Sequence, residues 1–244
     1  MSDSAVDSRA NTGSTAPGVS RRRLLGVDGV DGSGKSFLAE RLGATLGQVG
    51  LPTVLLRVDD FRRPIDWRQA GRSEAEVYYD DYYDLALLDA CASRFLAGAD
   101  AVEIPAFDSR VERHVGTRTV EFGAASVAVV EGVFALRSQA VRANAAVVYL
   151  RTTLPEARRR ILVRDTARGR TAEDVMHRIA ARYFPAHERY VRECDPVGSA
   201  AALIDHETLG APTVARLDRA RLGPVVAEAL TRAVGAFAPT ATVG

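Results

Sequence analysis

Glycine, serine and lysine residues near the N-terminus have the types and the spacing of a phosphate-binding loop. The stretch from Gly29 to Ser36 reads Gly-Val-Asp-Gly-Ser-Gly-Lys-Ser and fits the pattern G-x-x-x-x-G-K-[S/T] at every fixed position. Its glycines let the backbone take conformations closed to other residues and approach a ligand closely. The amides of such a turn point inward at the start of a helix, where partial positive charge favours phosphate. The stretch therefore predicts a P-loop that binds a nucleoside triphosphate.

Each side chain of this loop has an expected role. Lys35 would reach the β- and γ-phosphates, and the hydroxyl of Ser36 would bind the Mg²⁺ that they carry. Asp28 and Asp31 lie close to the same phosphates, and a metal ion would relieve their repulsion of ATP. ATP and Mg²⁺ are therefore the predicted cofactors. The predicted cofactor-binding residues are Gly29, Asp31, Gly32, Ser33, Gly34, Lys35, Ser36 and Phe37.

Two further groups of charged residues are typical of phosphoryl transfer. A carboxylate of the pair Asp59-Asp60 could take a proton from a substrate hydroxyl. Arg164, Arg168 and Arg170 cluster in a short Gly-containing loop that could close over the triphosphate and neutralise the transferring group. Taken alone, the aspartates could be a turn or a helix cap, and the arginines could be a solvated helix face. The predicted catalytic residues are Asp59, Lys35, Arg164, Arg168 and Arg170.

The elements around these residues must bring them together. A short buried strand at 23–28 precedes the P-loop, and residues 37–49 have helical spacing, which is the context that the motif requires. A second strand at 51–58 ends at Asp59, and ligands of open α/β sheets collect outside the carboxyl ends of strands. The apolar run 126–130 reads as a central parallel strand and ends at Glu131. In P-loop folds an acid there typically helps to hold Mg²⁺, so Ser36 and Glu131 are the predicted metal ligands.

The rest of the chain alternates between strands and helices. The segments 102–107 and 117–122 could pair as a hairpin. Thr153 and Thr171 are expected to cap two helices, and Pro185 to bend or end the second. The remaining expected elements are helices at 81–96 and 225–234 and strands at 145–150 and 201–204. The predicted fold class is α/β: a three-layer P-loop NTPase fold with a parallel sheet flanked by helices, a small hairpin insertion and an Arg-rich lid.

The length and composition indicate how many domains the chain can form. Its 244 residues, 47% of them hydrophobic, can bury one sizeable core. Residues 1–20 are rich in Ser, Ala, Gly and Asp, lack the apolar region of a secretory signal, and are predicted to be a disordered tail. Residues 21–240 are predicted to form a single domain. The apolar face of the last helix could pack on the core or on another subunit. The sequence therefore allows either a monomer or a homo-oligomer.

The net charge and the two cysteines indicate which partners and which cellular compartment to expect. A formal net charge of +1 gives no electrostatic case for nucleic acid or a membrane surface. No apolar run approaches the roughly eighteen residues that span a bilayer. The two cysteines lie far apart without metal-type spacing, so reduced thiols in a cytoplasmic protein are expected. The chain has no Asn-Lys-x-Asp run of the kind that GTPases use to recognise guanine.

Together these residues resemble the uridine kinase family and its relatives, the phosphoribulokinases and nicotinamide riboside kinases. The resemblance runs from about residue 23 to residue 205. Asp59-Asp60-Phe61 is similar to the D-x-F segment of the family, whose first aspartate is the catalytic base, and this role falls on Asp59. The run 129–133 matches the hydrophobic-E-G element, and residues 164–170 look like the R-D…R-G-R lid. The resemblance implies a P-loop kinase domain over residues 21–240.

The resemblance also implies an acceptor site. Residues 104–108, Ile-Pro-Ala-Phe-Asp, are similar to the I-P-x-[YF]-D segment that lines the acceptor nucleoside site, where Phe107 could stack on a base. Tyr79-Asp80 and Tyr83-Asp84 both resemble the aromatic-Asp pair whose Asp holds ribose hydroxyls, and Asp84 is preferred. The implied substrate-binding residues are Asp59, Asp84, Phe107, Asp108 and Arg110.

Two departures from the family pattern concern the acceptor and the lid. Glu112 occupies the place of a pyrimidine-facing histidine, and Ile161 replaces a lid arginine. The resemblance implies an ATP-dependent kinase that phosphorylates a hydroxyl of a small acceptor, foremost the 5′-hydroxyl of a nucleoside such as uridine or cytidine. The alternatives are a kinase for nicotinamide riboside, a sugar phosphate or pantothenate, and a non-catalytic nucleotide-binding regulatory protein.

Overall fold

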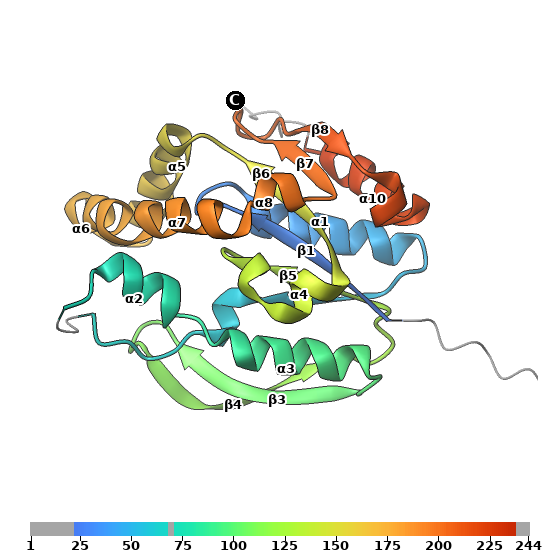
Figure 1. Ribbon diagram of the computed structural model, residues 1–244, viewed down its shortest axis with the longest axis horizontal. Coiled ribbons are helices and arrows are strands. Elements are labelled where there is room, and N and C mark those ends of the chain that lie inside the picture. Colours follow the sequence, from blue (N-terminus) through green and yellow to red (C-terminus); the bar gives the residue numbers. More distant parts are fainter. Residues whose placement is uncertain (1–21, 68–70, 238–244) are drawn as a thin grey trace, which may run out of the picture.

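A twisted sheet with helices on both faces forms the centre of the computed structural model, which describes residues 22–67 and 71–237 (Figure 1). The strand order is β2-β5-β1-β6-β7-β8. The strands span Arg23–Gly29 (β1), Thr53–Arg57 (β2), Val127–Glu131 (β5), Ala145–Arg151 (β6), Ala202–Asp205 (β7) and Thr213–Leu217 (β8). The predicted tail, residues 1–20, lies outside the described residues. The three-layer α/β arrangement confirms the predicted fold class.

The sheet is parallel except at one edge. β1 pairs with β5 and β6 in parallel, which brings the ends of β1, β2 and β5 to the same edge. β8, which the sequence analysis did not identify, pairs with β7 antiparallel. The connection 206–212 is too short for a parallel crossover, which needs a dozen or more residues, so the chain can only turn back. The expectation of a wholly parallel sheet was therefore wrong at this edge.

Alternating side chains of β1 build the two faces of the core. Leu25 and Val27 pack with α1 (Lys35–Gln48) and α10 (Pro224–Gly235) on one face. Leu24 packs on the other face with α3 (Leu85–Leu96), α4 (Gln139–Asn144) and α7 (Phe184–Cys194). Within residues 22–67 and 71–237, no helix combines the length and the apolar composition needed to cross a bilayer.

The predicted hairpin is present and lies below α3 in Figure 1. β3 (Ala101–Asp108) pairs with β4 (Arg113–Glu121), whose first residues were not expected to be strand. The hairpin is fixed to the 3-10 turn η1 (Val58–Phe61), which follows β2, by an ion pair of 2.7 Å between Arg118 and Asp60. It therefore lies beside the turn that carries Asp59.

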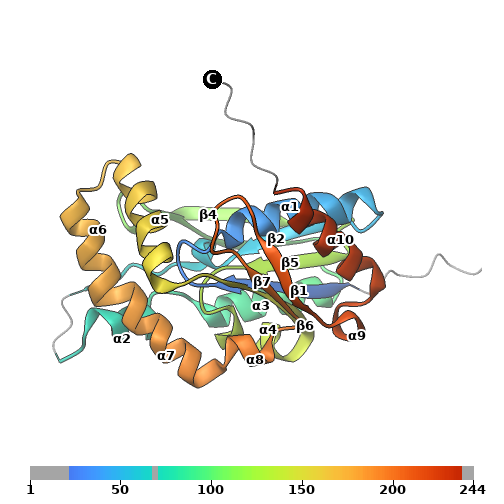
Figure 2. The ribbon, with the colours of Figure 1, turned by 90° about the horizontal axis from the view of Figure 1, so that it is seen from above.

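The helices of the lid side follow β6. They are α5 (Leu154–Ala167), α6 (Ala172–Arg178), the π-helical turn η3 (Ile179–Tyr183) and α7. Thr153 and Thr171 cap α5 and α6, as predicted. Pro185 does not end the helical path, which continues to Cys194 (Figure 2), but the π turn η3 interrupts the α-helical pattern just before it. The prediction that Pro185 could end the helix was wrong, because the π turn accommodates a residue that cannot donate a backbone hydrogen bond.

Shorter elements complete the structure. α2 (Glu74–Asp80) packs against η3 and α7, and a capping box between Ser73 and Glu76 starts it. The remaining short elements are η2 (Ala135–Arg137), α8 (Pro196–Ser199) and α9 (Arg219–Leu222).

Candidate active site

The P-loop connects β1 to α1 through two glycines in the left-handed region. Gly32 has φ 79° and Gly34, the N-cap of α1, has φ 94°. A Cβ at Gly34 would lie 2.8 Å from the ring of His206, and one at Gly32 would lie 2.8 Å from the carbonyl oxygen of Ala157. Neighbouring segments therefore require these glycines in addition to the close approach that a phosphate needs.

Polar groups of the loop are placed to receive phosphate. The Oγ of Ser33 is buried and has no hydrogen-bond partner among the described residues. The Nζ of Lys35, a residue that is 9% exposed, makes a long contact of 3.4 Å with the carbonyl oxygen of Val30. Buried donors normally find partners, so an unpaired hydroxyl and a weakly bound ammonium fit an anionic ligand.

Ser36 and Glu131 lie together, as predicted for metal ligands. The Oγ of Ser36 donates a hydrogen bond of 2.9 Å to Glu131 at the end of β5. Burial of the Glu131 carboxyl raises its pKa. No group of three or more His, Cys, Asp or Glu side chains that could hold a metal occurs in the described part of the chain. This pair fits Mg²⁺, because Mg²⁺ takes one or two protein ligands and fills its shell with phosphate oxygens and water.

One aspartate precedes the loop and another lies within it. Asp28 is fully buried, accepts hydrogen bonds from Tyr190 Oη and from the amide of Gly29, and its pKa is raised to about 7 by burial. Asp31 is partly buried, and desolvation raises its pKa although Lys35 and Arg164 oppose this. A positively charged ligand near the phosphates would offset the cost of ionising both groups.

A cavity of about 450 Å³ opens beside the loop. It brings together Asp31 of the P-loop, Asp59 of η1 and the three lid arginines, which the sequence analysis proposed separately. Its other lining residues are Arg62, Trp67, Tyr78, Tyr82, Tyr83, Phe107, Ser109, Arg110, Glu112, Asp165, Arg178, Arg182 and Tyr183. One cavity therefore joins the phosphate side and the acceptor side.

Both carboxylate oxygens of Asp59 have partners. Its Oδ1 accepts a hydrogen bond of 3.1 Å from Tyr83 Oη, and its Oδ2 forms an ion pair of 2.6 Å with Arg62. The carboxylate is exposed to the cavity and is held in one orientation by these two contacts. This geometry suits a group that accepts a proton from a bound hydroxyl.

A buried aspartate organises the lid. Asp165 is 1% exposed and pairs with Arg164 at 2.7 Å and with Arg170 at 3.1 Å. Although burial opposes it, the neighbouring guanidinium groups hold the pKa of Asp165 below its ordinary value. Arg160, one turn before Arg164, donates to the carbonyl oxygens of Ser33 and His206 and so ties α5 to the P-loop.

The predicted acceptor residues separate into two groups. Phe107 and Arg110 line the cavity, whereas Asp108 does not line it and pairs with Arg110 at 2.9 Å. Asp84 does not line the cavity, because its side chain caps α3 and pairs with Arg63 at 2.9 Å. Phe37, predicted to bind the cofactor, lies on the outer side of α1 and packs edge-on against Phe237 with ring centroids 4.7 Å apart.

The sequence analysis did not predict that Trp67, Tyr78 and Tyr82 would form an aromatic wall of the cavity. Tyr78 and Tyr82 pack tilted against each other, and the guanidinium of Arg182 lies 3.8 Å from the ring centre of Trp67. Glu112 lines the cavity, whereas His114 contacts the carbonyl oxygen of Arg62 and the edge of Phe107. The density of aromatic residues between 67 and 83 was the signal that could have identified this wall.

Comparisons with known proteins agree with this geometry. The model of the Phosphoribulokinase / Uridine kinase family matches residues 24–204. A uridine kinase of Staphylococcus epidermidis is 27% identical over 180 residues, which cover 71% of this chain and 83% of that protein.

Solved structures share the fold. A structure described as a possible uridine kinase from Bacillus stearothermophilus has a TM-score of 0.58 at 23% identity and covers 79% of this chain and 91% of its own. The D-glycerate 3-kinase from Cryptococcus neoformans has a TM-score of 0.57 at 16% identity and covers 80% of this chain and 90% of its own. The family match spans the P-loop, Asp59 and the lid arginines, so the protein belongs to the phosphoribulokinase/uridine kinase family and is a kinase.

Proposed function

We propose that the protein transfers the γ-phosphoryl group of ATP to a hydroxyl group of a small acceptor, the 5′-hydroxyl of a nucleoside such as uridine or cytidine. The observation that carries this proposal is the cavity shared by the P-loop, Asp59 and the lid arginines. Phosphoryl transfer needs little covalent chemistry from a protein and depends on positioning and on charge neutralisation. The cavity provides residues for both.

The phosphate side of the cavity would hold the donor. Lys35 and the amides of the P-loop would bind the triphosphate, with Ser33 Oγ as a further donor. Mg²⁺, held by Ser36 and Glu131 together with phosphate oxygens, would neutralise part of the triphosphate charge. Arg164, Arg168 and Arg170 would close over the transferring group.

The acceptor side would bind and orient the hydroxyl. Asp59 would accept its proton while Tyr83 and Arg62 hold the carboxylate in place. The rings of Phe107, Trp67 and Tyr82 line the same cavity and offer flat apolar surface to a base. Similarity to a uridine kinase supports a nucleoside acceptor.

A second candidate is an acceptor with a negatively charged group, such as a sugar phosphate. Four arginines outside the lid also line the cavity: Arg62, Arg110, Arg178 and Arg182. Each of them pairs with a carboxylate of the protein, namely Asp59, Asp108, Asp174 and Glu74. Guanidinium groups bind phosphate and carboxylate oxygens in pairs, so an anionic acceptor would share or replace these partners.

Acceptor-dependent release of ADP from Mg²⁺-ATP tests the proposal. The acceptors are uridine, cytidine, nicotinamide riboside, ribulose 5-phosphate and pantothenate, and the Lys35→Ala variant is the blank. Turnover with uridine or cytidine is the expected result. Turnover only with ribulose 5-phosphate would favour the anionic acceptor. Binding of ATP with no turnover on any acceptor would contradict a kinase of these substrates and favour a regulatory nucleotide-binding protein.

A further inference from the structure

Three hydrogen-bond contacts join Asp59 to the P-loop. Tyr83 Oη lies 3.1 Å from Asp59 Oδ1 and 3.3 Å from Tyr78 Oη, which lies 3.3 Å from Asp31 Oδ2. Both tyrosines are nearly inaccessible, with 5% and 3% of their surface exposed. A continuous line of oxygen atoms therefore runs inside the cavity wall from the acceptor side to the phosphate side.

A count of hydrogens shows what this line can do. It has three oxygen–oxygen contacts, but the two tyrosine hydroxyls supply only two hydrogens. When both carboxylates are ionised, each tyrosine donates to its own aspartate, and the contact between the tyrosines has no hydrogen. One additional proton on either aspartate fills all three contacts. The line is thus built to accept one proton.

We propose that Tyr83 and Tyr78 form a proton relay that carries the proton of the acceptor hydroxyl from Asp59 to Asp31. The relay rests on the proposed function. The acceptor oxygen forms its bond to the γ-phosphorus while the bond to the β,γ-bridging oxygen breaks and its electron pair leaves with ADP. The acceptor proton passes to Asp59. Asp59 then gives a proton to Tyr83, Tyr83 gives its own to Tyr78, and Tyr78 gives its own to Asp31.

The surroundings of the two aspartates favour this direction. After the relay has moved, Asp59 is ionised again and regains the charge that pairs with Arg62 at 2.6 Å. Desolvation raises the pKa of Asp31, so this carboxyl holds a proton readily. Burial raises the pKa of Tyr78 and of Tyr83 well above the ordinary value, so neither becomes a phenolate and the protons must move together.

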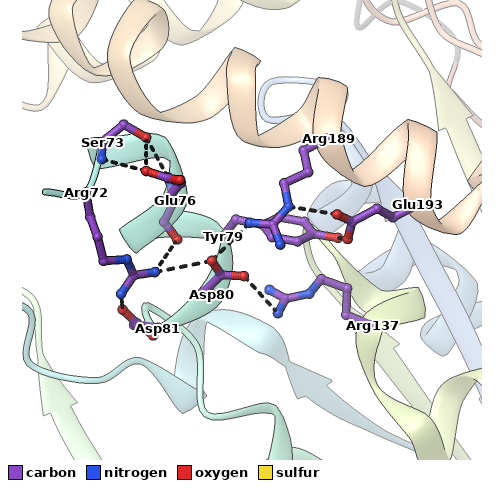
Figure 3. Close-up of polar contacts among 9 residues, drawn as sticks. All are labelled: Arg72, Ser73, Glu76, Tyr79, Asp80, Asp81, Arg137, Arg189 and Glu193. Carbon is purple, nitrogen blue, oxygen red and sulfur yellow. Dashed lines mark hydrogen bonds and ion pairs between the residues drawn. The ribbon is translucent and has the colours of Figure 1, made fainter.

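The sharpest variant is Tyr78→Phe, because Tyr78 contacts neither Asp59 nor Arg62. The matched control is Tyr79→Phe, the neighbouring residue of α2. The guanidinium groups of Arg137 and Arg189 lie 3.9 Å and 4.3 Å from the ring centre of Tyr79 (Figure 3). The hydroxyl of Tyr79 donates a hydrogen bond of 2.8 Å to Glu193, away from the relay. Each variant removes one hydroxyl that is bonded to a carboxylate. Only Tyr78→Phe interrupts the relay.

The experiment measures the rate of the first turnover after the protein is mixed with saturating ATP and uridine, in mixtures of H₂O and D₂O. Steady-state assays at varied acceptor concentration give the KM. If uridine is inactive, the most active acceptor of the panel replaces it. For the unmodified protein and Tyr79→Phe we expect equal rates and a curved dependence on deuterium content, as when several protons move together. For Tyr78→Phe we expect a rate at least about tenfold lower, a linear dependence and an unchanged KM for the acceptor.

Three outcomes would overturn the relay. They are a linear dependence in the unmodified protein, an unchanged rate for Tyr78→Phe, or a slower Tyr78→Phe whose dependence stays curved. If Tyr78→Phe does not fold, Tyr83→Phe interrupts the relay instead. Because Tyr83→Phe also removes the hydrogen bond to Asp59, its rate alone decides nothing, and a dependence on deuterium that stays curved would overturn the relay. Failure of the relay is distinct from failure of the proposed function, because the latter removes the turnover of the unmodified protein with every acceptor.

Discussion

Two adjacent aspartates follow β2, and the structure gives them different surroundings. Asp59 faces the cavity, whereas Asp60 pairs with Arg118 of the hairpin. If Asp59 is the base, Asp59→Asn should lower turnover by about 10²–10⁴, the usual contribution of general base catalysis, and leave ATP binding unchanged. Steady-state kinetics and ATP titration would measure both quantities.

Asp60→Asn is the matched control. It makes the same change one residue away and removes only a partly exposed ion pair, which is typically worth about 0–1 kcal/mol. We expect its turnover to stay close to that of the unmodified protein. Equal losses in the two variants would mean that the segment matters as structure and that Asp59 is not the base.

Asp28 should make stability depend on pH. Its pKa is raised from 3.8 to about 7 by burial, so the unfolded carboxyl ionises at lower pH than the folded one. The folded protein binds more protons than the unfolded protein between these pH values. The free energy of unfolding therefore falls as pH rises through this window.

Asp28→Asn tests this assignment, because the asparagine side chain does not ionise and the variant should not lose stability in this way. Urea unfolding at about pH 5 and about pH 8 should show the variant gaining stability relative to the unmodified protein at the higher pH. Parallel pH dependence of the two proteins would contradict the assignment.

The positions of candidate residues could be predicted where the signal is local in sequence. The P-loop could be located because all its groups lie within one turn, and Asp59 because a strand end places it at the sheet edge, while their chemical roles stay predictions. Asp84 and Phe37 were assigned from motif position alone. The structure instead places Asp84 at the cap of α3 and Phe37 against Phe237, contacts that depend on distant segments.

At the scale of elements, the lid depends on one buried carboxylate. Asp165 holds Arg164 and Arg170, and hydrogen bonds to charged groups are worth about 1.5–3 kcal/mol. Asp165→Asn should therefore misplace both arginines and lower turnover by about tenfold or more. Kinetics with ATP and acceptor varied in turn would show the loss mainly in kcat.

Asp174→Asn, on the neighbouring helix α6, is the comparison. Asp174 pairs with Arg178 at 2.9 Å and, more distantly, with the lid residue Arg170 at 3.9 Å. Its side chain is 38% exposed, so its loss should change turnover little. If Asp174→Asn were as damaging as Asp165→Asn, general loosening of the lid would explain both results, and the ordering role of Asp165 would be wrong.

Helix caps could be predicted, but helices held by tertiary contacts could not. Thr153 and Thr171 were recognised because their signal is local. α2 was not assigned as a helix because its stability comes largely from partners far along the chain. Asp80 pairs with Arg189 of α7 at 2.9 Å and with Arg137 of η2 at 3.9 Å (Figure 3). Such contacts do not appear in the periodicity of a sequence.

At the scale of the molecule, the chain beyond the family match belongs to the same core. The match ends at residue 204, whereas α10 begins at Pro224. α10 packs on α1, the helix that starts at the P-loop, and buries Leu230 completely. The sequence left open whether this apolar face meets the core or a second subunit, and the structure places it on the core.

Leu230→Ala tests whether residues 21–240 form one cooperative domain, as we propose. Trp67 is the only tryptophan of the chain and lies at the acceptor cavity, whereas Leu230 lies on the buried side of α10, on the other face of the sheet. Removing a buried leucine side chain costs about 2–5 kcal/mol, while Val225→Ala on the exposed side of α10 should cost no more than about 0.5 kcal/mol. In a single domain, Leu230→Ala should lower the urea midpoint seen by Trp67 fluorescence as much as the midpoint seen by circular dichroism. A fluorescence transition that stays unchanged would show that the acceptor side unfolds independently and that the chain contains two units.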